Sequence, residues 1–246
     1  MRLHFAGRQP NGLDSHLAET MSRAAQLRGF EISDLMLAEL VFVAVDVLDH
    51  GNLDEVLTCA KHVEQNCAKA HAIVIVSQVP PGFTRGFRDK RVVRIYYQVD
   101  TIITSRAVER VLRPEQFVVG CADPAAPLPL AYQEYLAAHA CPVRQMSYES
   151  AELAKCAINY FLAGQIKMSC ELAVAAAQVG ADWGDVARAV GGDARIGPHA
   201  YLRPGKTNQH LERDLMTVLA LRGRAQGERE EGEPELMTPG VPVFSP

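Results

Sequence analysis

Lys155 and Asn159 are the residues whose types and spacing most readily suggest chemistry. Residues four apart share one face of a helix, so an ammonium and an amide stand side by side there. Together they offer several hydrogen-bond donors to one anionic or developing oxyanion centre. A simpler interpretation is that Lys155 pairs with Glu152, one turn earlier, and that both side chains face solvent. The spacing alone favours this simpler interpretation.

A long, largely buried helix is expected to carry this pair. From residue 149 to about residue 179 only Gly164 weakens the helical pattern, and apolar residues occupy most of the circumference. We expect this helix to form the spine of a helical domain over residues 148–223 and to support a homodimer. Two shorter helices are expected after it, over 183–190 and about 208–222.

The first 147 residues follow a different pattern, in which short β-type runs alternate with helical segments. The expected strands are 2–6, 40–45, 72–76, 92–97, 116–120 and 142–146. Such alternation is typical of βαβ units and a parallel sheet. The sequence therefore predicts an α/β fold, with a Rossmann-like parallel sheet in 1–147 followed by the all-helical domain. Residues 224–246 are acidic and rich in Pro and Gly, which predicts a flexible tail.

Composition and charge narrow the classes of function. The chain has 246 residues, of which 48% are hydrophobic and 22% charged, so it can bury a sizeable core. Its net charge of −4 argues against nucleic acid or an anionic membrane as partner. The six cysteines and eight histidines lack metal-ligand spacing, so we expect no metal and free thiols in a reducing cytoplasm. No apolar run approaches the roughly 20 residues that cross a membrane.

Four segments of the chain follow one another as in a known enzyme family. They are residues 77–84 (SQVPPGFT), 112–120 (LRPEQFVVG), 151–163 (AELAKCAINYFLA) and 193–198 (DARIGP). This ordered set resembles the UDP-glucose/GDP-mannose dehydrogenase family from about residue 70 to residue 205. Enzymes of that family oxidise a nucleotide sugar at C6 to the uronic acid and use two NAD.

The resemblance implies roles for five residues. Lys155 and Asn159 match the pair that steadies oxyanionic intermediates and the attacking water. Arg195 matches an arginine that contacts the sugar nucleotide, often from the neighbouring subunit. Tyr201 stands near the aromatic residue of the substrate loop. Asp214 matches the aspartate that ends the catalytic-cysteine segment.

Other positions depart from the family pattern. Counting back from Asp214 puts His210 where the catalytic thiol belongs, and an imidazole cannot form the thiohemiacetal and thioester of the second oxidation. Gln78 follows Ser77 where the family has Ser-Thr. Thr104 replaces the glutamate expected as general base, and a threonine hydroxyl does not take up a proton at pH 7. We expect Gln78 and Thr104 to contact the substrate.

The cofactor end also departs from the pattern. Residues 7–12 (GRQPNG) lie between a strand and a helix, where a dinucleotide fingerprint belongs. Gly7, Gly12 and Ser77 are the candidate cofactor-binding residues. The side chain of Gln9 obstructs the approach of a pyrophosphate to the backbone. The ribose-binding acid would fall near Glu31 or Asp34, but the strand that should present it is missing. We expect NAD binding to be weak or lost, and a tight βα turn with no ligand is the alternative.

Two functions remain open from these residues. The first is a divergent NAD-dependent 6-dehydrogenase relative that binds a nucleotide sugar but cannot complete the oxidation to the uronic acid. The second is a non-catalytic pseudoenzyme that keeps the fold as a sugar-nucleotide-binding, partner or regulatory protein. The family's third domain, a second Rossmann-like unit, is not found in the sequence.

Overall fold

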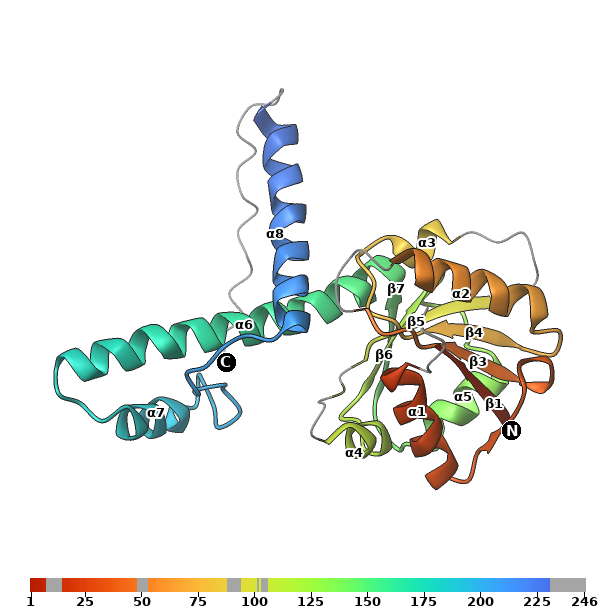
Figure 1. The fold of residues 1–246 in the computed structure, drawn as a ribbon, viewed down its shortest axis with the longest axis horizontal. Helices are drawn as coiled ribbons and strands as arrows, with labels where there is room; N and C mark the ends of the chain where they lie inside the picture. The colour runs from red at the N-terminus through yellow and green to blue at the C-terminus, as the bar shows by residue number, and fades with distance from the viewer. Residues whose placement is uncertain (8–14, 48–52, 88–93, 101, 103–105, 231–246) are drawn as a thin grey trace.

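The computed structural model describes residues 1–7, 15–47, 53–87, 94–100, 102 and 106–230, the last seven of these as backbone. Gly12, Gln9 and Thr104 lie outside the described residues, as does the predicted tail beyond residue 230. A sheet with helices on both faces forms one half of the molecule, and a long helix projects from it to form the other half (Figure 1).

Seven strands of the described chain form one sheet in the order β2-β1-β3-β4-β5-β6-β7. Their bounds are β1 Arg2–Ala6, β2 Glu31–Ile32, β3 Leu40–Val43, β4 Ala72–Ile75, β5 Arg94–Gln98, β6 Phe117–Cys121 and β7 Val143–Ser147. The Rossmann-like sheet is confirmed, and five of its six pairings between neighbouring strands run parallel. The expectation of a wholly parallel sheet is wrong, because β5 and β6 pair antiparallel. Helix α4 (Ala107–Leu112), between them, packs against α1 instead of crossing back over the sheet.

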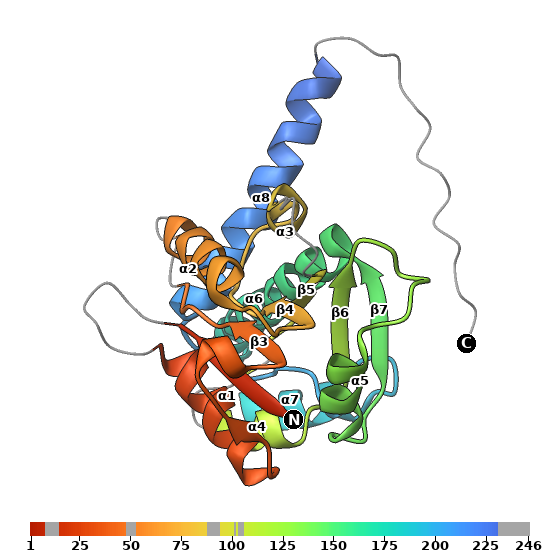
Figure 2. The same ribbon diagram turned by 90° about the vertical axis from the view of Figure 1, so that its right-hand side faces the viewer.

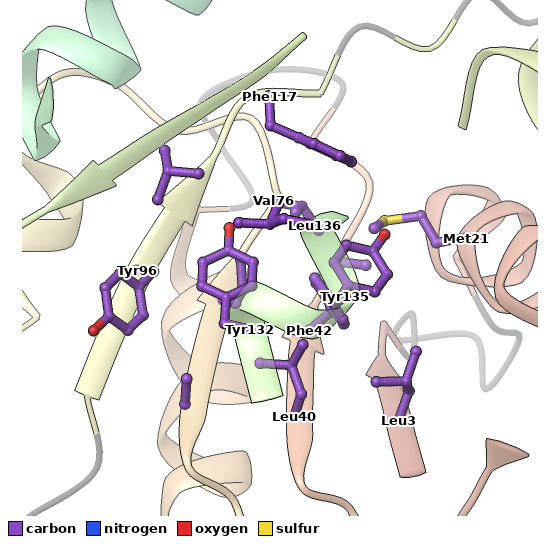
Figure 3. Packing of buried hydrophobic residues seen from close by; sticks show 14 of the residues in the cluster. Leu3, Met21, Leu40, Phe42, Val76, Tyr96, Phe117, Tyr132, Tyr135 and Leu136 are labelled. Atoms are coloured by element: carbon purple, nitrogen blue, oxygen red, sulfur yellow. The ribbon is translucent and has the colours of Figure 1, made fainter. Parts of the chain in front are cut away.

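Helices cover both faces of the sheet, which explains why its central strands are continuous apolar runs. On one face lie α1 (His16–Leu27) and α5 (Leu130–Ala137). Tyr132 and Tyr135 of α5 lie over Leu40 and Phe42 of β3 (Figure 3). On the other face, α2 (Leu53–Asn66) packs against the sheet together with the start of the long helix. Short helices η1 (Leu35–Leu37) and α3 (Phe83–Gly86) complete this half.

The long helix α6 spans Tyr148–Gln178 and begins where β7 ends. Ser147, the last residue of β7, caps it by accepting a hydrogen bond from the N–H of Ser150 at 3.2 Å. Gly120 of β6 lets this first turn lie close, since a Cβ there would stand 3.0 Å from the Cβ of Ala151. The rest of α6 leaves the sheet and carries the helical half (Figures 1 and 2).

Two further helices pack on α6. They are α7 (Trp183–Gly192), which lies at its far end, and α8 (Gln209–Glu230), which crosses it nearer the sheet (Figure 1). Helix α8 extends beyond the predicted end at 222, so residues 224–230 of the predicted tail are helical. Arg and Glu there are good helix formers, and they outweigh Gly227. Within the described residues, no helix has the length and apolar character needed to cross a membrane.

Candidate functional site

A cavity of about 560 Å³ lies where the sheet meets the helical half. Its sheet side is formed by residues that follow β3, β4 and β5, and by the first turn of α1. Its helical side is formed by α6, by the start of α8 and by the segment that precedes α8. Carboxyl ends of parallel strands are where open α/β sheets hold ligands. Five candidate residues line this cavity together: Gln78, Lys155, Asn159, Tyr201 and His210.

Lys155 faces inward and is 5% exposed. Its ammonium donates to the backbone carbonyl of Asp100 at 2.7 Å. Glu152, one turn earlier, is fully buried and accepts from the amides of Gly82 and Thr84 at 2.6 and 2.8 Å. The simpler interpretation, a solvent-facing pair of Lys155 and Glu152, is therefore wrong. Each side chain anchors α6 to a different loop at the carboxyl edge of the sheet.

Asp100 and Gln78 join the ends of β5 and β4 at the floor of the cavity. The Asp100 carboxylate accepts from the side-chain amide of Gln78 at 3.1 Å and from the N–H of Ile102 at 2.8 Å. The oxygen of the Gln78 side chain has no hydrogen-bond partner among the described residues. Gln78 is thus fixed in the cavity with an unused acceptor.

Asn159 belongs to a buried network that ties α6 to α8. Its side-chain amide donates to the Asp214 carboxylate at 2.6 Å, and the Arg213 guanidinium donates to the other oxygen of Asp214 at 2.7 Å. Arg213 also donates to the carbonyl of Val47, just beyond β3. The side chains of Arg213 and Asp214 are 3% and 4% exposed. The network holds the start of α8 over the cavity.

His210 occupies the first turn of α8 and lines the cavity beside Lys155 and Asn159. Burial lowers the pKa of His210, and the positive charges of Arg213 and Lys155 lower it further. The imidazole is therefore neutral at pH 7. Its Nδ1 atom is buried and has no hydrogen-bond partner within the described chain.

The cysteines take no part in this cavity. All six thiols are free, and none belongs to the described residues that line the cavity. Cys156 is buried, and burial raises the pKa of its thiol to about 12. A thiol with so high a pKa is a poor nucleophile at pH 7. Among the described residues, no group of three His, Cys, Asp or Glu could hold a metal ion.

Tyr201 and Arg195 come from the segment between α7 and α8, and the structure separates them. Tyr201 lines the cavity, and its N–H donates to the side chain of Gln165 on α6 at 2.8 Å. Arg195 lies outside the cavity of its own chain, with an exposed side chain paired to Asp193 at 2.8 Å. Within a single chain Arg195 therefore does not share the cavity of Lys155, because its pair with Asp193, the C-cap residue of α7, holds it beside that helix.

Two of the predicted cofactor residues, Gly7 and Ser77, are engaged in packing. Gly7 lies so close to β3 that a Cβ would meet the carbonyl oxygen of Ala44 at 2.4 Å. The Ser77 hydroxyl is fully buried, donates to the carbonyl of Val43 at 3.3 Å and accepts from the N–H of Val45 at 2.8 Å. Both residues join β1, β3 and β4 at the cavity edge, and the Ser77 hydroxyl is not free to contact a ligand.

Asp46 stands at the same edge, and sequence reasoning missed it. It follows β3 and lines the cavity, and its carboxylate accepts from the N–H groups of His16 and Leu17 at 2.7 and 3.2 Å. Asp100 and Arg213 were missed as well. An aspartate directly after the apolar run of β3, and another after β5, are the signals that could have found Asp46 and Asp100.

Comparison with known proteins connects this geometry to one family. The protein-family model described as "UDP-glucose/GDP-mannose dehydrogenase family, central domain" matches residues 149–228. This range holds Lys155, Asn159, His210 and Asp214. The chain is a relative of the UDP-glucose/GDP-mannose dehydrogenases. The resemblance inferred from the sequence motifs is thereby confirmed.

Two curated dehydrogenases are similar in sequence to this chain. UDP-glucose 6-dehydrogenase of Pseudomonas aeruginosa is 30% identical over 206 residues, which are 76% of this chain and 45% of that protein. UDP-glucose 6-dehydrogenase YwqF of Bacillus subtilis is 27% identical over 183 residues, 70% of this chain and 41% of that protein. The chain thus spans less than half of the length of the curated relatives it matches.

Solved dehydrogenase structures share the fold of this chain. A UDP-glucose dehydrogenase from Pyrobaculum islandicum has a TM-score of 0.70 at 21% identity, with 92% of this chain and 64% of that chain covered. A ternary complex of GDP-mannose dehydrogenase from Pseudomonas aeruginosa has a TM-score of 0.62 at 17% identity, with 92% and 65% covered. Both confirm the sheet followed by a long central helix.

Proposed function

We propose that the cavity binds a nucleotide sugar of the UDP-glucose or GDP-mannose type, and that this chain does not complete its oxidation to the uronic acid. The observation that carries the proposal is the set of Lys155, Asn159 and His210 around one cavity. The first two match the pair expected to steady oxyanionic intermediates. Tyr201 and Gln78 are proposed substrate contacts, since they line the same cavity.

His210 supports the second part of the proposal. Conversion of an aldehyde to an acid in this family needs a thiol that attacks the aldehyde carbon. The thiohemiacetal is then oxidised by the family's second NAD to a thioester, which water hydrolyses to the acid and the free thiol. An imidazole at this position forms neither covalent adduct. The neutral imidazole of His210 can instead accept a proton from a sugar hydroxyl or donate a hydrogen bond to it.

The cofactor side supports weak or lost binding of NAD. In dinucleotide-binding folds, an acid near the end of the second strand holds the ribose. Here β2 has two residues, and Glu31 pairs in register with Arg2, at the opposite end of β1 from Gly7. Glu31 and Asp34 line a separate hollow between α1 and β2. Glu31 therefore lies away from the turn at Gly7, and the two-residue β2 leaves the cofactor side poorly built for NAD.

The pseudoenzyme remains the second candidate, as a protein that binds a nucleotide sugar and acts on a partner. The engaged Ser77 hydroxyl and the short β2 favour it, because both weaken the cofactor side while the helical side of the cavity is intact. The six free cysteines support a reducing, cytoplasmic setting.

A homodimer through α6 is the proposed assembly. Three large apolar residues recur on one face of this helix at spacings of seven and four, and the C-cap residue continues the row seven residues later. All four are exposed in the single chain: Phe161, Met168, Leu172 and Val179. An exposed apolar stripe of this length is typical of an interface. Arg195, which lies outside the cavity of its own chain, is proposed to reach the nucleotide sugar of a second copy.

The experiment is calorimetric titration of the purified chain with UDP-glucose and GDP-mannose. Lys155→Met, which removes the buried ammonium at nearly constant volume, should weaken binding by about tenfold or more, as expected for loss of a charged hydrogen bond. Lys167→Met is the matched control, since Lys167 lies on the same helix with an 81% exposed side chain. Equal affinities of all three proteins would overturn the assignment of the site.

The second arm tests the oxidation. Wild-type protein is incubated with each nucleotide sugar and excess NAD, and the absorbance of NADH and the mass of the product are followed. No uronic acid is expected above the background of a blank without protein. Formation of the uronic acid by the wild type, absent from a preparation of Lys155→Met, would contradict the proposal.

A further inference from the structure

Helix α1 begins at the cavity, and the amides of its first turn are already occupied. The Asp46 carboxylate accepts from the N–H of His16 at 2.7 Å and from that of Leu17 at 3.2 Å. The Ser15 hydroxyl accepts from the N–H of Ala18 at 3.0 Å. Every unpaired amide at the start of α1 therefore has a partner supplied by the chain itself.

The start of this helix is where a diphosphate would bind. In doubly wound folds the helix after the first strand presents its N-terminal amides and its positive dipole end to the phosphates of a dinucleotide. A carboxylate supplies what the diphosphate would supply there, a negative charge with oxygens that accept from two amides. Asp46 thus makes the interactions that the cofactor's phosphates would make.

Asp46 is held in this place by its neighbours along the chain. The N–H of Val45 donates to the buried Ser77 hydroxyl at 2.8 Å, and the carbonyl of Val47 accepts from the buried Arg213 guanidinium. Both flanking residues are almost fully buried. These bonds fix the backbone on both sides of Asp46, so a ligand could displace the carboxylate only by breaking its two bonds to the amides of α1 and turning the side chain away.

We propose that Asp46 is an internal anion that closes the diphosphate subsite at the start of α1 against NAD. The role of Asp46 adds to the proposed function. It depends on that function only for the identity of the ligand that occupies the rest of the cavity. A dinucleotide would have to displace the carboxylate from two amides and would still meet its negative charge in a partly buried site.

The experiment compares four proteins by calorimetric titration with NAD at low ionic strength: the wild type, Asp46→Asn, Asp46→Ser and Asp182→Asn. Asn keeps the size of the side chain and removes its charge, and Ser is itself a good helix cap. Asp182 is the matched control, because it caps α7 by accepting from the N–H of Asp185 at 2.9 Å and does not line the cavity. Thermal melting of each protein reports its folding.

We expect no saturable binding of NAD to the wild type or to Asp182→Asn. The two Asp46 variants should bind NAD at least about tenfold more tightly than these two. Micromolar binding of NAD to the wild type would overturn the proposal. So would folded Asp46 variants that gain no affinity, or an equal gain in Asp182→Asn.

A measurement on the wild type covers the case in which both Asp46 variants unfold. NAD added to isotope-labelled wild type should leave the amide resonances of His16 and Leu17 unshifted, and a saturable shift of either would overturn the proposal. Failure of the proposed function is recognised separately. If UDP-glucose and GDP-mannose do not bind the wild type while Asp46→Asn gains NAD, the function fails and the role of Asp46 stands.

Discussion

The two halves of the molecule bury their apolar residues to very different degrees. In the sheet half, Phe42, Ile73 and Tyr97 are completely buried between the strands and the helices on either face. In the helical half, Phe161 is 71% exposed and Val179 is 80% exposed. The sheet half thus forms a complete core within one chain. The helical half has an apolar face that one chain leaves uncovered.

Polar chemistry gathers where these two halves meet. Lys155, Asn159, Arg213 and Asp214 are all buried, and each is hydrogen-bonded across the junction or within the pair of helices that form it. Farther along α6, the charged pair of Lys167 and Glu171 lies in solvent. Burial of polar groups at the junction indicates that the site and the attachment of the helical half depend on the same residues.

The largest expected effect is in the sheet half. Phe42→Ala should lower the free energy of unfolding by about 3–5 kcal/mol, because the side chain is fully buried and its loss leaves a cavity among the strands and aromatic rings. Its ring stacks on Phe5 with centroids 4.9 Å apart and lies 4.8 Å from that of Tyr135. Urea denaturation measures the change. A loss below about 1 kcal/mol would contradict a self-contained core here.

The next effect tests the junction. Asp214→Ala should cost about 3 kcal/mol, because it leaves the Arg213 guanidinium buried without its carboxylate and removes the partner of Asn159. Asp193→Ala is the control, since it breaks an Asp–Arg pair in which Arg195 is 88% exposed. That change should cost less than about 1 kcal/mol. Similar unfolding curves for the two variants would show that the junction network adds no stability.

The fold was more predictable than its details, for a physical reason. Doubly covered strands need unbroken apolar runs, so residues 40–45 and 72–76 stood out and became β3 and β4. The antiparallel pairing of β5 and β6 depends on where α4 packs, and tertiary contacts decide this rather than the local sequence. The end of α8 was placed too early, because charged residues suit both a solvated helix and a tail.

The site was predicted in part. Spacing placed Lys155 and Asn159 on one face of a helix, and motif order brought in His210, Tyr201 and Asp214. Spacing could not show that Lys155 turns inward to the carbonyl of Asp100, because backbone acceptors have no signature in a sequence. The partner of Glu152 is likewise a pair of backbone amides.

A buried histidine should make the stability of the sheet half depend on pH. Burial lowers the pKa of His139 to about 4, against 6.5 in the unfolded chain, and its ring lies edge-on to Phe117. The unfolded state therefore binds more protons between these values, so stability is full above pH 6.5 and falls as the pH drops toward 4. Between pH 7 and pH 5 the loss should be about 2 kcal/mol.

His139→Gln provides the check on that titration. Denaturation curves at pH 7 and pH 5 should differ by about 2 kcal/mol less in this variant than in the wild type. The glutamine also loses packing against Phe117, but that loss is the same at both pH values. An unchanged difference between the two pH values would rule out His139 as the titrating group.

The smallest effect on folding, and the most direct test of the helical half, is expected from Phe161→Ala. Its side chain is exposed in the single chain, so the free energy of unfolding of one subunit should change by less than about 0.5 kcal/mol. If α6 pairs with a second copy, the same change removes a large apolar contact from the interface and should raise the dimer dissociation constant by about tenfold or more.

Leu130→Ala separates the interface from exposure alone. Leu130 on α5 is also 71% exposed, but it lies in the sheet half, away from the apolar stripe of α6. Sedimentation velocity over a range of concentrations should show wild type and Leu130→Ala as dimers where Phe161→Ala has dissociated. A wild type that remains a monomer at high concentration would overturn the proposed homodimer.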